Sequence, residues 1–331
     1  MRFLDPPLLQ PVAFDSFGVK AMCTRVETPD LIITIDPGVS VQSEQFPLPQ
    51  KTLEQLLHRY EEEVLTSCQR SQAIVISHYH LDHFTCQRQP DIYAGKIIFA
   101  KALDDLPVKQ QETAKKFFKM IDGLPKEIIW ADSRKFKFKK TEISFSDPIW
   151  HGKADAEPGK VLMTFISRGK KRVLVSSDIA GPVDEKTTNL ICAFNPHEAV
   201  IDGYPSFLEP EPSNDLELIK SIINICRILY LPGLKTLILD HHLARDYRYP
   251  VLFKTVYQQA AKLKKGFGTA AELSDRKSAV LEGLQNYGTT RYHRWQPLEP
   301  SDLRNTLQTA IAKGEISLDW LNSFDRWVLK T

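Results

Sequence analysis

One short segment, residues 77–83, constrains this chain more than any other. It reads Ser-His-Tyr-His-Leu-Asp-His, so four side chains that can bind a metal lie within six residues. The apolar, mostly β-branched run at residues 73–76 comes directly before it and predicts a buried strand. His78 and His80 are two residues apart, so an extended strand end directs both imidazoles to the same face, and Asp82 and His83 follow around the turn. Such a cluster of imidazoles and a carboxylate predicts a metal site rather than a solvated polar turn.

Four further strand-like runs end in residues that could join this cluster. Residues 31–35 run into Asp36, residues 143–150 into His151, residues 172–177 into Asp178, and residues 235–239 into Asp240, His241 and His242. This ordered set of motifs, between about residues 14 and 250, resembles the metallo-β-lactamase superfamily. The resemblance implies an α/β fold of the αββα type, in which two packed mixed β-sheets carry helices on their outer faces.

Three sequence segments carry a closer resemblance to one family. Residues 14–20, 35–39 and 238–246 are similar to a little-studied, largely archaeal family of predicted metallo-hydrolases within that superfamily. Residues 202–205 also fit a loop of that family, with Tyr204 in place of its first Pro. That family has no established substrate, so the resemblance specifies the fold and the ligands but not the reaction.

The superfamily resemblance implies a site for two divalent metal ions. The first ion would take His78, His80 and His151, the second would take Asp82, His83 and His241, and Asp178 would bridge the two. His242 is an alternative to His241 or a supporting residue, and Asp36 and Asp240 are expected to brace the ligands. Zinc is the favoured metal, and iron and manganese are alternatives.

The same resemblance implies a hydrolase in which the dinuclear site activates a bridging hydroxide. Zinc β-lactamases of the best-known type have Cys where this chain has Asp178, which favours esters, thioesters or phosphodiesters over β-lactams. A phosphodiester is slightly favoured, because residues 239–245 resemble the strand-end His motif of tRNA-processing and cyclic-phosphate members. A thioester or lactone hydrolase is the alternative, and a redox or non-catalytic metal protein is the alternative of another class.

Five residues are candidates for roles beyond metal binding. Asp82 and Asp178 are the candidate catalytic carboxylates for handling the proton. Tyr204, Ser206 and Arg245 are candidate substrate contacts, although the loop that holds Tyr204 and Ser206 could be purely structural. Arg245 could instead pair with the adjacent Asp246.

Composition narrows the partners and the compartment. Lys and Arg number 43 against 41 Asp and Glu, a net charge of +2, which favours a small-molecule or phosphodiester substrate over nucleic acid. The five cysteines follow no close-spaced pattern and predict a reducing, cytoplasmic location. A secretory signal and an apolar run of about 18 residues are both missing from the sequence, so no membrane contact is expected.

The last part of the chain is expected to be a helical extension. We predict a hydrolase domain at residues 1–265 and a C-terminal extension at residues 266–331, with helices at residues 251–265, 270–286 and after Pro300. One predicted helical face carries apolar residues three to four apart: Ile316, Trp320, Leu321, Phe324, Trp327 and Val328. This aromatic face is expected to pack on the core or to form a homodimer.

Overall fold

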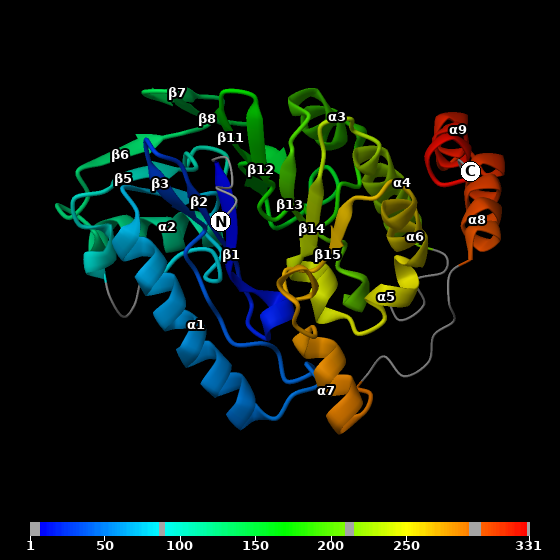
Figure 1. The fold of residues 1–331 in the computed structure, drawn as a ribbon, viewed down its shortest axis with the longest axis horizontal. Helices are drawn as coiled ribbons and strands as arrows, with labels where there is room; N and C mark the ends of the chain where they lie inside the picture. Colours follow the sequence, from blue (N-terminus) through cyan, green and yellow to red (C-terminus); the bar gives the residue numbers. More distant parts are fainter. Residues whose placement is uncertain (1–6, 86–89, 209–214, 291–298, 330–331) are drawn as a thin grey trace.

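Two β-sheets lie face to face, and helices cover their outer sides (Figure 1). The structure is a computed structural model that describes residues 7–85, 90–208, 215–290 and 299–329. The N-terminal sheet has the strand order β1-β2-β3-β4-β5-β6, antiparallel from β1 to β3 and parallel from β3 to β6. Its strands are β1 (Leu8–Phe14), β2 (Met22–Glu27), β3 (Ile32–Ile35), β4 (Ala73–Ile76), β5 (Ile97–Ala100) and β6 (Glu127–Trp130).

The C-terminal sheet has the order β15-β14-β13-β12-β11-β8-β7. The pairs from β7 to β12 are antiparallel and those from β12 to β15 are parallel. Its strands are β7 (Lys135–Phe138), β8 (Thr141–Phe145), β11 (Thr164–Arg168), β12 (Lys171–Val175), β13 (Glu198–Asp202), β14 (Thr236–Asp240) and β15 (Gly266–Gly268). A separate hairpin joins β9 (Ile149–Trp150) to β10 (Lys160–Val161).

Successive side chains of a strand point to opposite faces of its sheet, and this alternation divides the core into two layers. Val173 and Val175 of β12 face the N-terminal sheet and join the cluster that reaches α1 (Gln50–Arg70) and α2 (Val108–Met120). Leu174, between them, faces the other way and packs under the helices of the C-terminal sheet. These are chiefly α3 (Glu185–Phe194), α4 (Leu216–Leu229), α5 (Tyr249–Leu252) and α6 (Lys254–Lys262). The αββα architecture predicted from the sequence is therefore confirmed.

The parallel strands place the predicted ligands at one edge of the sandwich. Five strands pair in parallel with a neighbour and end at this edge: β3, β4, β12, β13 and β14. Their carboxyl ends lead into the loops that hold Asp36, residues 77–83, Asp178 and His241. Carboxyl ends of parallel strands are where α/β folds build their sites. Residues far apart in the sequence meet there for that reason.

Local expectations differ from the structure in four places. The expected helix at residues 270–286 is wrong in its first half: a short turn at Glu272–Ser274 ends at Asp275, whose left-handed backbone (φ 54°) breaks the helix, and α7 (Ala279–Tyr287) begins only after Ser278. The expected helix at residues 251–265 is interrupted at Phe253, which has non-helical dihedral angles. Helix α3 and strand β15 were not expected.

The C-terminal helices α8 (Pro300–Ala312) and α9 (Leu318–Trp327) pack beside α4. Phe324 and Val328 are buried, and Trp320 and Trp327 are partly buried against the same cluster. Strand β15 pairs with β14 just beyond residue 265. The domain division at residue 265 and the homodimer remain predictions. Among the described residues, we find no helix with the length and apolar character that a bilayer crossing requires.

Candidate metal centre

Asp178 stands at the centre of a ring of histidines. The residue follows β12 and is 2% exposed. Its Oδ2 lies 3.2 Å from His151 Nε2, 3.4 Å from His78 Nε2 and 4.0 Å from His80 Nδ1. One ligand atom from each of these four residues lies within 4.8 Å of the others, a spacing that one metal ion can span.

The other oxygen of Asp178 faces a second cluster. Its Oδ1 lies 3.0 Å from His83 Nε2 and 3.2 Å from His241 Nε2. Asp82, His83 and His241 again offer ligand atoms within 4.8 Å of one another. Asp178 therefore directs one oxygen to each cluster, although an overlapping group of Asp178, His241 and His242 also exists.

Two orphaned atoms show that the cluster suits metal ions. His83 Nε2 and Asp178 Oδ1 are fully buried and lie 3.0 Å apart, but neither atom makes a hydrogen bond of good geometry within the described part of the chain. Such groups cost about 1–3 kcal/mol each unless something binds them. Burial lowers the pKa of His78 to about 3, helped by the nearby His83, so its lone pair is free for a cation. Burial alone would raise the pKa of Asp178, but His241, His83 and His78 hold it well below its ordinary value. The donor set fits divalent metals.

Asp36 ties the two ligand loops together. Its carboxylate accepts hydrogen bonds from the backbone N–H of Ser77 at 2.9 Å and from the hydroxyls of Ser77 and Ser177 at 2.7 and 2.8 Å. Its Oδ2 also lies 3.2 Å from His83 Nδ1. Nearby, a Cβ at Gly38 would lie 2.3 Å from the backbone of residues 82–84, so only glycine allows the ligand loop to approach. Asp36 thus has the bracing position expected from the sequence.

Asp15 is a supporting residue that the sequence analysis did not single out. The buried carboxylate lies 2.7 Å from His241 Nδ1 and accepts hydrogen bonds from Arg245 Nε at 2.6 Å and Gln42 Nε2 at 2.7 Å. Burial opposes ionisation, yet Arg245 and His241 lower the pKa of Asp15 to about 2. A carboxylate behind a histidine fixes the orientation of its ring. The signal that could have pointed to Asp15 is its place in residues 14–20, one of the runs that carried the family resemblance.

Asp240 and Asp202 hold the last two histidines. Asp240 accepts hydrogen bonds from the backbone N–H groups of Ser16, His241 and Ala270 at 3.1, 2.6 and 2.8 Å, and burial raises its pKa to about 6. Asp202 Oδ1 lies 2.9 Å from His242 Nδ1, and burial raises the pKa of Asp202 to about 7. Asp240 therefore holds backbone N–H groups, and Asp202 holds the Nδ1 side of the His242 ring.

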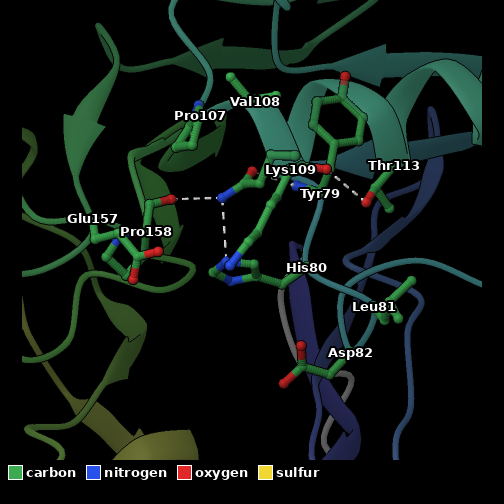
Figure 2. Close-up of a pocket in the computed structure, with 11 residues that line it drawn as sticks. Tyr79, His80, Leu81, Asp82, Pro107, Val108, Lys109, Thr113, Glu157 and Pro158 are labelled. Atoms are coloured by element: carbon green, nitrogen blue, oxygen red, sulfur yellow. Dashed lines mark hydrogen bonds between the residues drawn. The ribbon is translucent and has the colours of Figure 1, made fainter.

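Two pockets open beside the clusters. The central pocket has a volume of about 520 Å³ and is lined by ligands of both clusters together with Lys20, His242 and Arg245. The side pocket, of about 600 Å³, lies between the first turn of α2 and the loop that holds Glu157 and Pro158 (Figure 2). His80, Asp82 and Pro158 line both pockets.

The three predicted substrate contacts lie in different surroundings. Arg245 lines the central pocket, where its guanidinium binds Asp15 and lies 3.6 Å from Asp82 Oδ2. It does not pair with Asp246, which binds Arg248 instead. The Tyr204 hydroxyl donates to Asp215 Oδ2 at 2.6 Å. The buried Ser206 hydroxyl donates to Asp246 Oδ2 at 2.8 Å, so both hydroxyls have structural partners.

The packed sheets, the outer helices and the His/Asp clusters at the strand ends define a protein of the metallo-β-lactamase fold with a candidate metal site. The chain is 33% identical over 279 residues to a UPF0282 protein of Metallosphaera sedula, covering 83% of this chain and 90% of the relative. It is 34% identical over 281 residues to a UPF0282 protein of Saccharolobus solfataricus, with the same coverage. The chain belongs to the UPF0282 family, which confirms the resemblance to an archaeal family. No protein-family model matches the sequence.

Solved structures resemble this chain at low sequence identity, and the resemblance in fold rests on the first of the two described below. Unliganded yeast PDE1 superimposes with a TM-score of 0.50 and 12% identity, covering 79% of this chain and 96% of that one. YhfI from Bacillus subtilis, described as a metallo-β-lactamase fold protein, gives a TM-score of 0.45 and 13% identity over 79% of this chain and 95% of that one. At this identity the likeness concerns the fold alone.

Proposed function

We propose that this protein is a metal-dependent hydrolase that uses two divalent metal ions, most favourably zinc. The observation that carries the proposal is Asp178, which turns one oxygen to each of two histidine clusters at the floor of an open pocket. His78, His80 and His151 would hold one ion, and Asp82, His83 and His241 the other. Bound ions would acidify a water molecule to a nucleophile near neutral pH and polarise the bond under attack.

The geometry supports His241 rather than His242 as the last ligand. His241 Nε2 points to Asp178, and its Nδ1 lies against Asp15. His242 lines the central pocket with its Nδ1 anchored on Asp202, which supports a role in moving a proton at its other nitrogen, Nε2. Asp178 and Asp82 remain the candidate catalytic carboxylates, acting through the metals that they would hold.

A phosphodiester is the favoured substrate class. Lys20 and Arg245 line the central pocket, and their positive charges suit a substrate that carries a negative charge at the reacting group. Thioesters and lactones are the second candidates, because Arg245 is already neutralised by Asp15 and lies near Asp82. Nucleic acid is the less favoured form of a phosphodiester.

Metal analysis combined with a substrate panel tests the proposal. Purified protein reconstituted with zinc, iron or manganese should hold about two ions per chain and hydrolyse one of the phosphodiester, thioester and lactone substrates in the panel. Fewer than one equivalent of every metal would overturn the metal site. Two bound ions without turnover of any ester would overturn the hydrolase and leave a redox or non-catalytic metal protein.

A further inference from the structure

We propose that the side pocket binds an apolar arm of the substrate, an aliphatic or aromatic group attached next to the reacting bond. The inference rests on the proposed hydrolase function and specifies its substrate class as small esters or phosphoesters with such an arm. The side pocket and the central pocket would then hold the two parts of one molecule.

The lining of the side pocket is largely carbon. Leu81 and Val108 are among the large apolar side chains that the fold leaves exposed, at 54% and 71%. Both line this one pocket, together with Pro107 and Pro158 (Figure 2). A single exposed apolar side chain needs no explanation, but a group of them around a cavity indicates a binding surface. The volume of about 600 Å³ lies in the usual range for small-molecule sites.

The side pocket adjoins the candidate metal centre. His80 belongs to the first cluster and Asp82 to the second, and both also line the side pocket. A group in the side pocket would therefore lie directly beside the bond held over the two clusters. This adjacency favours an occupant that is part of the substrate over a separate ligand.

The walls of the side pocket are held together by one buried amide. Gln110 is 4% exposed, and its Oε1 accepts the backbone N–H of Tyr79 at 3.1 Å. Its Nε2 donates to the carbonyl of Pro158 at 2.6 Å and lies 3.2 Å from His80 Nε2. Behind this contact, Pro107 packs on Gly159, where an added Cβ would lie 2.5 Å from the proline ring. The pocket is thus formed before a ligand arrives, which reduces the entropic cost of binding.

The charges around the side pocket argue against a nucleic-acid strand. Lys109 and Glu157 both line it, so its two ionisable side chains outside the metal motif carry opposite signs. A strand of nucleic acid needs a row of positive groups for successive phosphates. One small molecule with an apolar arm suits a carbon-lined pocket with balanced charge better.

Binding of two phosphonates tests this inference without requiring turnover. Methylphosphonate and hexylphosphonate carry the same tetrahedral anionic head, which resembles the product of phosphoester hydrolysis and the transition state of carboxylic-ester hydrolysis, and differ only in the arm. Each fully buried methylene gives about a fourfold gain in affinity. We expect the zinc-loaded, full-length protein to bind hexylphosphonate at least about tenfold more tightly than methylphosphonate in calorimetric titrations, allowing for partial burial.

A pair of matched variants locates the effect. Val108 and Leu318 are each the exposed first residue of a helix, but only Val108 lines the side pocket. In Val108→Asn the ratio of the two affinities should fall by about threefold, whereas Leu318→Asn should keep the wild-type ratio. Circular dichroism spectra check that both variants fold.

Separate outcomes contradict the two proposals. The apolar-arm subsite would be overturned by equal affinity for the two phosphonates or by no measurable binding of hexylphosphonate. It would also be overturned if the ratio of the two affinities were the same in Val108→Asn and Leu318→Asn. Bound zinc without hydrolysis of any ester would overturn the hydrolase proposal, and the phosphonate ratio would still report on the side pocket.

Discussion

At the scale of single residues, the candidate centre depends on carboxylates that each serve more than one partner. Asp178 faces both histidine clusters, and Asp15 contacts His241, Arg245 and Gln42. The ligand motif at residues 77–83 is contiguous, so its chemistry could be predicted from the sequence. Asp15 lies 226 positions from His241, and its role depends on a contact that no local pattern encodes.

Asp178→Ala should abolish hydrolysis while the fold is retained. The change removes the only carboxylate that faces both clusters in the described ranges 7–85, 90–208, 215–290 and 299–329, so we expect fewer bound metal ions as well as lost turnover. Metal analysis and kinetics on the best substrate found measure both effects. Asp325→Ala, which removes an exposed ion pair between α9 and Arg304 of α8, is the control. Wild-type turnover in Asp178→Ala would show that Asp178 is not a bridging ligand.

Asp15→Asn should weaken metal binding without removing a ligand. Loss of the carboxylate behind a metal-binding histidine typically costs about 10–100-fold in metal affinity or activity. We expect a loss of that size in competition titrations with a zinc chelator, and a smaller loss in hydrolysis at saturating zinc. Asp325→Asn serves as the control for the charge change. An unchanged zinc affinity would contradict the role given to Asp15.

At the scale of secondary-structure elements, strands were easier to predict than the segments between them. Buried strands such as β4 and β14 are short apolar runs that end at the ligand motifs, and their short length and β-branched residues identify them as strands. The expected helix at residues 270–286 fails after one turn, Glu272–Ser274, because Asp275 takes a left-handed backbone conformation with φ 54°. Asp240 accepts the backbone N–H of Ala270 where this turn begins, a contact between residues 30 positions apart that the helical pattern does not reveal.

Acid should weaken the contact between β5 and the loop that precedes α2. Lys101 is buried at the end of β5, and its Nζ lies 2.5 Å from Asp105 Oδ1 and 2.7 Å from Asp132 Oδ2. Partial burial opposes ionisation of Asp105, but Lys101 and Lys160 lower its pKa below the ordinary value of 3.8. Because the folded-state pKa is the lower one, this stabilisation is complete above about pH 3.8 and is lost as the pH falls through the folded-state pKa.

Asp105→Asn therefore should show a smaller loss of stability in acid than the wild type. The free energies of unfolding from urea titrations at pH 5 and at pH 3 give the comparison. Asp104→Asn, at the exposed neighbouring position, is the matched control. If Asp105→Asn and Asp104→Asn lose the same stability between the two pH values, the carboxylate of Asp105 contributes nothing through this linkage.

At the scale of the whole molecule, the candidate metal centre and the C-terminal helices occupy different parts of the fold. The clusters lie at the strand ends between the two sheets, whereas α8 and α9 lie beside α4 on the outside of the C-terminal sheet (Figure 1). The sequence could predict an apolar face on α9, because helical spacing reveals it. It could not identify what covers that face, since α4 is about 100 residues earlier in the chain.

Phe324→Ala should destabilise the protein without changing its metal content. Phe324 is fully buried where α9 packs beside α4, and truncating a buried phenylalanine typically costs about 3–5 kcal/mol. The ligands belong to other elements, so the soluble, folded variant should bind as much zinc as the wild type. Leu318→Ala, at an exposed position of the same helix, should stay within about 0.5 kcal/mol of the wild type in urea titrations. An unchanged free energy of unfolding in Phe324→Ala would show that α9 does not stabilise the core.

Light scattering tests the predicted homodimer. A dimer held by the aromatic face should dissociate in Trp320→Ala and in Trp327→Ala. A monomeric wild type would contradict the dimer.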